Sequence, residues 1–429
     1  MAFNDEPTIP FPPYDYSIGP FPSHIYNDTI DIGYEGRRSP FDDENTLQID
    51  DDKATLGRVL FYDTKLSSSE KISCASCHKQ EFSFADGKAK SNGVTELTSR
   101  NSMHLNGMAW NNTSFYSWDM EHETIEEMIA LPLNDPNEIG LDMDMLIDKL
   151  FNTTYYPHLF QAAYGHPLAT EEKIKESLIH FMFSMVSFDS KHDQGASIDF
   201  ENFSASELLG LELFKRNCSS CHSQGRSYYI HSSINRNGLP EDSNDLGAGV
   251  WDSTLMHAFK LTSLRNIEVT NPYMHDGRFE TLEEVVEHYS DTLVTSPDNW
   301  FLPPQGFQFN KVEQEALVDF MKTFTDHTFL TEEKWSDPFK GVTSSIDLQR
   351  ALNLSIYPNP ASDLIQISFS NSKSENVSIE LLTASGSLIS TYSTIDNAIS
   401  IDGTDLSPGM YILRLRLGDE QVAKKLVVK

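Results

Sequence analysis

Basic residues and cysteines are scarce in this chain, and long apolar runs are missing. Its 429 residues include 32 Lys and Arg against 64 Asp and Glu, which gives a formal net charge of −32. Such an excess of negative charge repels the phosphates of nucleic acids and anionic lipids, and it favours a basic protein partner or a small neutral substrate. No run of about 18 apolar residues is present, so no segment is suited to cross a bilayer as a helix.

The four cysteines fall into two motifs of identical spacing, each followed by a histidine. These residues are Cys74, Cys77, His78, Cys218, Cys221 and His222. The pattern C-x-x-C-H is the attachment signature of c-type haem, because two thiols on one helical turn can both bond to the haem vinyl groups while the histidine faces the iron. A thioredoxin-like redox pair needs no following histidine, whereas a zinc site could use ligands from both copies. We favour two covalently attached haems, because both copies carry the histidine and no cysteine is left over.

The N-terminus shows no export signal, although haem attachment of this kind normally takes place outside the cytoplasm. Residues 1–7 have neither a basic start nor an apolar stretch. We therefore expect that the true start lies upstream, or that a signal has been removed.

The spacing of the motifs predicts a multidomain protein, with two mainly α cytochrome c-like haem domains followed by a small β-sandwich. We expect an extended N-terminal arm over 1–52, haem domains over 53–202 and 203–340, a linker over 341–350 and the sandwich over 351–429. Helical spacing and start signals predict helices over 53–62, 122–131, 143–151, 170–188, 281–289 and 311–325, and another that starts at Ser204. The last segment alternates apolar and polar residues between turns and lacks His, Cys and Trp, so we expect it to be β and not catalytic.

Residues from about 53 to 340 resemble the bacterial di-haem cytochrome c peroxidase family, which includes the methylamine dehydrogenase maturase MauG. Beyond the haem motifs, the matching stretches are 56–63 (LGRVLFYD), 84–87 (FADG), 100–101 (RN), 118–119 (WD), 264–266 (LRN) and 270–277 (TNPYMHDG). The end of the chain resembles the type A sorting domain of the type IX secretion system, through 357–360 (YPNP), 409–411 (GMY) and 424–429 (KKLVVK). The resemblance implies outer-membrane translocation, cleavage of the tail, and a body that is secreted, periplasmic or at the cell surface.

The resemblance implies that the first haem is the peroxide site and the second transfers electrons. The family's distal histidine has no counterpart in 91–99, and the next histidine, His104, is more often structural at such a position than a substitute ligand. We therefore expect an open iron at the first haem without prior reduction. The family's Gln, Pro and Glu at this site correspond to Met128, Pro132 and Glu138, with Glu138 as the acid–base group and Met128 as a departure that removes a hydrogen-bond donor.

The same resemblance assigns a bridge between the haems, a second distal ligand and a calcium ion. Trp118 corresponds to the inter-haem tryptophan, and Tyr289 to the distal ligand of the second haem, where electron-accepting peroxidases have Met and the MauG type has Tyr. Alternatively, Tyr289 packs on the haem edge, and Met274 or His288 is the ligand. Asn101, Thr270 and Pro272 match positions that hold calcium between the haem domains.

Three functions follow as alternatives. The first is a peroxidase that reduces hydrogen peroxide to water with electrons from a donor protein such as a small cytochrome. The second is a MauG-like oxidase that modifies a partner protein or small molecule, and the third is a cell-surface electron-transfer cytochrome. In all three the tail engages the secretion machinery.

Overall fold

The computed structural model places the chain in two compact units. It describes residues 6–10, 12–17, 48–110, 116–121, 124–222, 234–240, 242, 244–291, 302–340, 355–361, 364–369, 377–383, 388–404, 406–417 and 420–429. The first unit, called the body below, is Phe11–Asp337, and the second joins Met1–Pro10 to Pro338–Lys429. The predicted linker 341–350 lies outside the described residues. The predicted boundary at 202/203 falls inside the body and stays a prediction.

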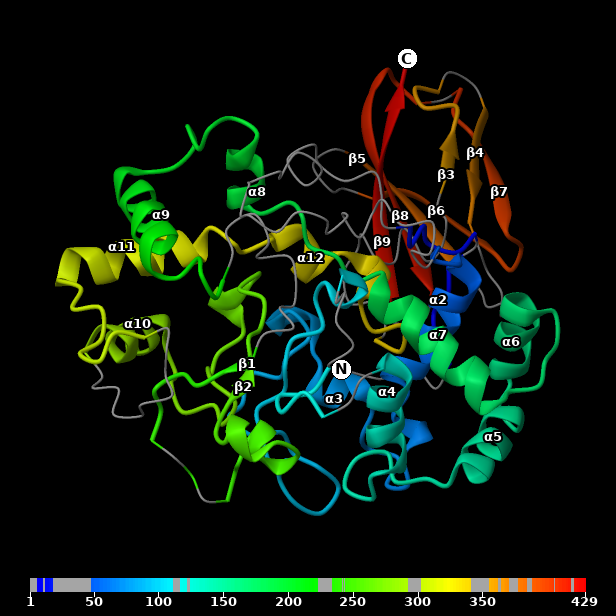
Figure 1. Ribbon diagram of the computed structural model, residues 1–429. Helices are drawn as coiled ribbons and strands as arrows, with labels where there is room; N and C mark the ends of the chain where they lie inside the picture. Colours follow the sequence, from blue (N-terminus) through cyan, green and yellow to red (C-terminus); the bar gives the residue numbers. More distant parts are fainter. Residues whose placement is uncertain are drawn as a thin grey trace. The chain divides into compact units, whose positions relative to one another are not determined.

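The described part of the body is mainly helical (Figure 1). Its helices are α2 (Asp51–Tyr62), α3 (Cys74–Cys77), α4 (Ile125–Asn134), α5 (Met143–Phe151), α6 (Tyr156–Tyr164), α7 (Glu171–Phe183), α8 (Lys191–Ala196), α9 (Ala205–Asn217), α10 (Leu282–Asp291), α11 (Lys311–Lys322) and α12 (His327–Thr331). Two short antiparallel strands, β1 (Ile234–Asn235) and β2 (Phe259–Lys260), pair within it. In Figure 1, α9, α10 and α11 gather at one end of the body, and α2, α4, α5, α6 and α7 at the other.

Two helix pairs cross closely at a glycine, one at each end of the body. A Cβ atom on Gly57 of α2 would lie 2.0 Å from the Ser177 carbonyl oxygen of α7, and one on Gly210 of α9 would lie 2.0 Å from the Ala316 carbonyl oxygen of α11. Only a residue without a side chain lets the backbones approach so closely. Each pair therefore packs closely at one end of the body, and each lies next to one Cys-x-x-Cys-His motif.

Side-chain caps decide where several of these helices begin. Ser204 and Glu207 form a reciprocal capping box at the start of α9, and Thr124 and Glu127 form another at the start of α4. The predicted helix 122–131 therefore begins at Ile125, and it continues through Pro132 to Asn134.

The predicted helix over 170–188 ends earlier than expected, at Phe183. The Ser184 hydroxyl bonds to the Phe181 carbonyl at 2.6 Å, and Asp326 accepts bonds from the Ser187 hydroxyl and the Asp189 amide, both at 2.9 Å. These side-chain hydrogen bonds take the place of the backbone hydrogen bonds that would continue the helix after Phe183.

A hydrophobic core fills the space between α9, α10 and α11. Its buried members are Phe203, Leu211, Leu213, Phe214, Tyr273, Leu282, Val286, Ala316, Leu317, Val318, Phe320, Met321 and Phe324. Cys218 of the second motif packs against this cluster, so the core holds the motif in place.

Part of the predicted N-terminal arm packs on the body. Tyr16 is fully buried, its ring meets Phe181 edge-on at 6.3 Å, and its amide bonds to the Asp51 carboxylate at 2.8 Å. These contacts hold Tyr16 against α2 and α7, and the extended arm over 1–52 stays a prediction.

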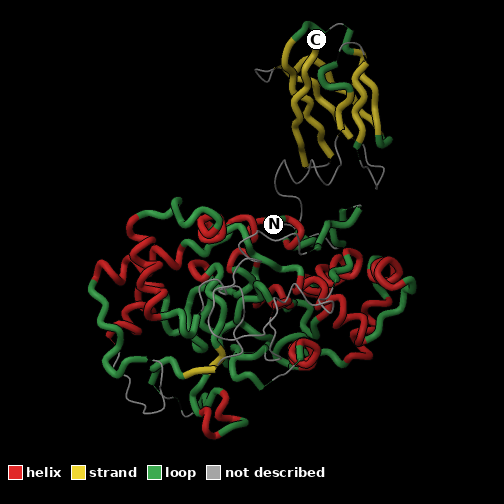
Figure 2. Tube along the Cα trace, turned by 45° about the horizontal axis from the view of Figure 1, so that its top comes forward, coloured by secondary structure: helices red, strands yellow, loops and turns green. Residues whose placement is uncertain are grey.

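The C-terminal unit is a β-sandwich, as the alternating pattern predicted (Figure 2). Its strands are β3 (Ser355–Tyr357), β4 (Leu364–Ser368), β5 (Val377–Thr383), β6 (Leu388–Thr394), β7 (Ala398–Asp402), β8 (Gly409–Leu417) and β9 (Glu420–Val428). They form antiparallel sheets of order β3-β4-β7 and β6-β5-β8-β9. Alternate residues such as Ile365, Ile367, Ile379 and Leu413 meet in one core between the sheets.

Candidate functional site

The first Cys-x-x-Cys-His motif forms one helical turn, α3. The His78 amide closes the turn on the Cys74 carbonyl at 2.9 Å, and the Ser76 hydroxyl accepts from the Ser73 amide at 3.0 Å. None of the four cysteines forms a disulfide bond. The pair in α3 is therefore held on one turn and is available for covalent attachment.

A strained turn fixes the ring of His78. Nδ1 of His78 lies 2.7 Å from the Phe84 carbonyl oxygen. Since a carbonyl only accepts, Nδ1 carries the proton, and Nε2 keeps a free electron pair for a metal. Ser83 and Phe84 both have left-handed backbones, with φ of 54° and 64°, which L residues adopt only where the surroundings impose it. Burial lowers the pKa of His78, which favours the neutral ring that a metal needs.

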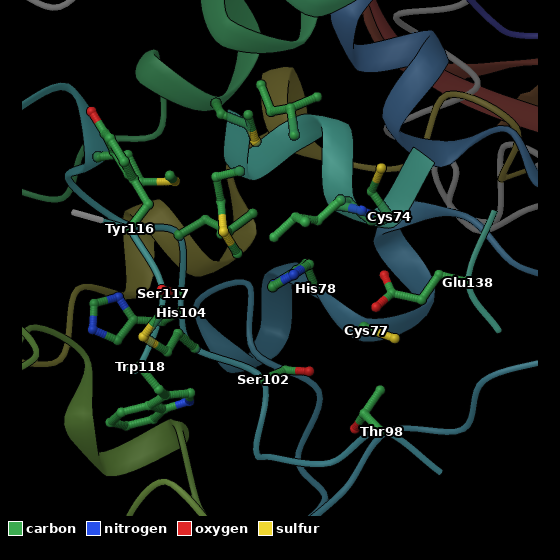
Figure 3. A pocket seen from close by; sticks show the side chains of 18 of the residues that line it. Cys74, Cys77, His78, Thr98, Ser102, His104, Tyr116, Ser117, Trp118 and Glu138 are labelled. Carbon is green, nitrogen blue, oxygen red and sulfur yellow. The ribbon is translucent and has the colours of Figure 1, made fainter. Parts of the chain in front are cut away.

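A cavity of about 380 Å³ opens beside this motif (Figure 3). Its wall includes Cys74, Cys77, His78, Arg100, Asn101, Met103, His104, Met108, Tyr116, Trp118, Met128, Pro132, Glu138, Met182 and Lys260. The volume lies within the usual range of cofactor sites. Every residue predicted for catalysis at the first haem therefore meets in one cavity.

Glu138 faces the cavity from the turn after α4. In Figure 3 its carboxylate lies beside Cys77. Burial raises the pKa of Glu138, and the negative charge of Asp135 adds to the rise. Burial also raises the pKa of Cys74 to about 12, and Glu138 contributes to that shift too. Glu138 is thus a desolvated carboxyl group beside the motif thiols, suited to exchange protons.

Trp118 and His104 lie on the side of the cavity away from Glu138 (Figure 3). The Trp118 indole N–H donates to the Asn101 carbonyl at 2.8 Å, and its own carbonyl accepts from the Lys260 amide of β2 at 2.8 Å. His104 donates through Nε2 to the Ser263 carbonyl at 3.0 Å, and burial lowers its pKa to about 4. His104 is thereby fixed to the β2 side of the cavity as a neutral ring.

The second motif follows directly on α9. Cys218 is the C-cap residue, and the His222 amide donates to its carbonyl at 2.8 Å. Burial raises the pKa of Cys218 to about 12, with Cys221 adding to the rise. In the described part of the chain, no three His, Cys, Asp or Glu side chains are grouped to hold a metal ion.

Tyr289 of α10 lies within electrostatic reach of this second pair of thiols. Burial raises the pKa of Tyr289, and both Cys218 and Cys221 contribute. The alternative ligands are engaged elsewhere: His288 Nε2 donates to the Asn237 carbonyl at 2.8 Å, and the Met274 sulfur accepts from the Asn237 side chain at 3.5 Å. The assignment of Tyr289 as the distal ligand stays a prediction.

The predicted calcium residues are partly committed to other bonds. The Asn101 amide group donates to the Lys88 carbonyl at 2.8 Å, which leaves its side-chain oxygen for a cation. The Thr270 hydroxyl donates to the Ile267 carbonyl at 3.3 Å, and Pro272 follows a cis peptide bond. The calcium site stays a prediction.

Two cavity residues, Lys260 and Tyr116, were not predicted from the sequence. Lys260 is 4% exposed, and burial lowers its pKa to about 7. Its ammonium group lies 5.6 Å from the centre of the Tyr116 ring, and burial raises the pKa of that phenol to about 12. The only signal for Lys260 is its place between the apolar residues Phe259 and Leu261.

Comparisons with known proteins show which family has this arrangement of residues. Residues 51–199 match the model of the di-haem cytochrome c peroxidase family. The chain is 32% identical over 281 residues to the methylamine utilization protein MauG of Methylophilus methylotrophus, an alignment that covers 63% of this chain and 82% of that protein. The chain belongs to the di-haem cytochrome c peroxidase family. It is therefore an oxidoreductase of a family that carries two c-type haems.

Other relatives agree with this placement. The cytochrome c551 peroxidase of Nitrosomonas europaea is 30% identical over 283 residues, 64% of this chain and 80% of that one. A solved MauG-like protein associated with microbial copper homeostasis aligns with a TM-score of 0.62 at 28% identity, over 68% of this chain and 94% of that chain. The diheme peroxidase BthA of Burkholderia thailandensis shares the fold, with a TM-score of 0.58 at 20% identity over 70% and 93% of the two chains.

Residues 355–429 match the secretion system C-terminal sorting domain, which confirms the second predicted resemblance. Among the described residues, no helix combines the length and apolar character needed to cross a membrane.

Proposed function

We propose that this protein is a di-haem c-type peroxidase that reduces hydrogen peroxide to water at the first haem. Electrons come from an external donor, such as a small cytochrome, through the second haem. The observation that carries the proposal is the meeting of Glu138, Trp118 and the Cys74–His78 motif in one cavity.

The residues of both motifs suit covalently bound haem. Cys74 and Cys77 would hold the first haem, with His78 Nε2 as its iron ligand, because the Phe84 carbonyl fixes the proton on the other ring nitrogen. Cys218, Cys221 and His222 would hold the second, with Tyr289 as the distal ligand. Bound haem supplies a metal centre that accepts peroxide and stores oxidising equivalents.

Glu138 moves the proton that the reduction of peroxide requires. Its carboxylate takes a proton from the peroxide and returns it to the oxygen that leaves as water. Burial raises the pKa of Glu138, which makes the carboxyl group a stronger base and helps it take up this proton before releasing it. Met128 and Pro132 line the same cavity as Glu138. Because a thioether cannot donate a hydrogen bond, Met128 positions peroxide only by its shape.

Trp118 relays electrons between the two sites. Its N–H is held by the Asn101 carbonyl, and its carbonyl is tied to β2, which pairs with β1 close after the second motif. These two bonds hold the indole in place beside the first motif and tie its backbone to β2, which supports the proposed relay. The sorting domain directs the protein out of the cell, and Asn101, Thr270 and Pro272 would bind calcium between the haem sites.

A MauG-like oxidase is the second candidate function, and Tyr289 favours it. An anionic oxygen ligand stabilises higher oxidation states of iron, which suits an enzyme that accumulates oxidising equivalents before it meets its substrate.

Absorption spectra and peroxide turnover test both functions. We expect the mature ferric protein to show one high-spin and one low-spin haem, and to consume peroxide with a reduced small cytochrome. Oxidising species that persist in peroxide without a donor, combined with no cytochrome turnover, would favour the oxidase. Two fully low-spin haems without turnover would overturn both functions and indicate an electron-transfer cytochrome.

A further inference from the structure

A large aromatic side chain, Trp251, stands at the surface close to the inter-haem tryptophan. It follows the short 3₁₀ turn Ala248–Val250, and 48% of it is exposed, beside the 60% exposed Val250. Its indole N–H donates to the Asp119 carbonyl at 2.8 Å. An exposed indole fixed by its single polar atom is held in one orientation without being part of a core.

Asp119 connects Trp251 to the cavity. It is the residue directly after Trp118, and Trp118 lines the cavity beside the first motif. The two indoles are therefore linked through one backbone segment and one hydrogen bond. Trp118 forms the cavity end of this link, and Trp251 forms the solvent end.

The charges around the link suit the removal of an electron from Trp251. Arg100 bonds to both Asp119 and Asp245, and Asp252 follows Trp251 in the chain. Although burial opposes it, the Ser117 hydroxyl and the Arg100 guanidinium keep the pKa of Asp119 below its usual value. Hydrogen bonds from Thr254 lower the pKa of Asp252. Asp119 accepts the Trp251 hydrogen bond through its carbonyl and Asp252 follows Trp251 in the chain, and ionised carboxylates near an indole stabilise a positive charge on it.

Both indole N–H groups are bonded to carbonyl oxygens, which are very weak bases. An indole that loses an electron here therefore keeps its proton and its positive charge. It can take an electron from a neighbour and return to its starting state, which is what a relay requires.

We propose that Trp251 is a surface oxidation site, at which electron-rich phenols give up one electron to Trp251, Trp118 and the haem cavity in turn. The proposal rests on the proposed peroxidase function and adds a substrate class to it. The phenol can be a free molecule or a tyrosine side chain of a partner protein, since both present the same ring to Val250 and Trp251.

The reaction balances with peroxide as the only oxidant. Two phenols each lose one electron and one proton and become phenoxyl radicals. One hydrogen peroxide accepts the two electrons and two protons, its O–O bond breaks, and two water molecules form.

A phenol coupled to soluble dextran tests the site, because the polymer cannot enter a cavity of about 380 Å³. We expect the holoenzyme to oxidise it with peroxide and W251F to be slower by about tenfold or more, because phenylalanine is hard to oxidise. W251Y, which restores an oxidisable ring, should recover at least about a third of the rate. Turnover with a reduced cytochrome should stay within about twofold in all variants, and so should haem content. F151L, which changes an exposed aromatic on α5, is the matched control.

The outcomes separate the two proposals. Equal oxidation of the dextran-linked phenol by W251F, or no oxidation of it by an enzyme that turns over with cytochrome, overturns the surface site. No peroxide turnover with either donor overturns the proposed function, and the surface site with it. Free phenol and a tyrosine-containing peptide are then compared as substrates. The substrate whose oxidation rate falls more from the wild type to W251F is the source that the site uses.

A second readout follows the side chain itself. Peroxide without any donor should add oxygen to Trp251, detected by peptide mass spectrometry, and leave the buried Trp335 unchanged. Equal modification of both tryptophans, or of Trp335 alone, contradicts the relay.

Discussion

The carboxyl group of Glu138 shares its cavity wall with the first motif, so its protonation should control peroxide turnover. Burial and Asp135 raise its pKa above the usual value of about 4.3. A base must be ionised to accept a proton, so turnover should fall as the pH drops through this raised pKa. E138Q should lose about 10²- to 10⁴-fold in rate and show no such acid limb, as measured by pH–rate profiles.

Asp135→Asn provides the control for that profile. It removes the neighbouring negative charge and keeps Glu138, so the acid limb should move to lower pH while the maximal rate is retained. An E138Q variant that keeps the wild-type rate with full haem content would assign proton transfer to another group.

Tyr289 lies near both thiols of the second motif, so its oxygen should set the reduction potential there. Tyr289→Met replaces an anionic oxygen by a thioether, and we expect the potential of the second haem to rise, because thioether ligation favours ferrous iron. Spectroelectrochemistry measures the shift. Tyr289→Phe, which supplies no ligand atom, should instead open the iron and produce a second high-spin signal. Unchanged potentials and spectra in both variants would show that Tyr289 only packs nearby.

At the scale of elements, the glycine crossings should hold each end of the body together. Gly210→Ala places a methyl group against the α11 backbone, so the helices must separate, and we expect a loss of about 2–3 kcal/mol in unfolding free energy. Gly57→Ala should do the same at the α2–α7 crossing. Urea denaturation followed by tryptophan fluorescence measures both.

Gly165→Ala separates crowding from backbone strain. Gly165 has φ of +68° and no atom near the position of an added Cβ, so we expect only the cost of about 1–2 kcal/mol of a left-handed L residue. A loss for Gly210→Ala no larger than this would indicate that the α9–α11 pair tolerates separation.

The elements that sequence reasoning found are those with strong local signals. The helix at Ser204 was predicted from the start signal Ser204–Glu207, and the sandwich was predicted because apolar and polar residues alternate along several of its strands. Helices α6 and α8 were missed, because α6 begins with Tyr156-Pro157 without a capping side chain and α8 spans only six residues. The turn at Ser83 and Phe84 that orients His78 has no sequence signal, since tertiary contacts impose its left-handed backbone.

The same division applies to the site. Cys74 and His78 were predicted from the spacing of the Cys-x-x-Cys-His motif, and Glu138 was predicted from its place in the family pattern. Lys260 was missed because its burial depends on how β2 packs against the cavity. A surface relay at Trp251 depends on one long-range hydrogen bond to Asp119, which a sequence does not reveal.

At the scale of the whole molecule, catalysis and export should be separable. The sandwich core consists of residues between Ile356 and Val428, whereas the cavity is lined by residues of the body alone. A chain that ends at Lys340 should therefore keep its haem content and its peroxide turnover within about twofold, as each unit buries its own core. It should no longer leave the periplasm, which cell fractionation measures.

Ile379→Asp tests the same separation without shortening the chain. Ile379 is fully buried in the sandwich, and an isolated charge there costs several kcal/mol, enough to unfold a domain of this size. Export should fail while the turnover of periplasmic protein persists. If turnover falls together with export in both variants, the sandwich also supports the body, and the tail belongs to the working enzyme as well as to its delivery.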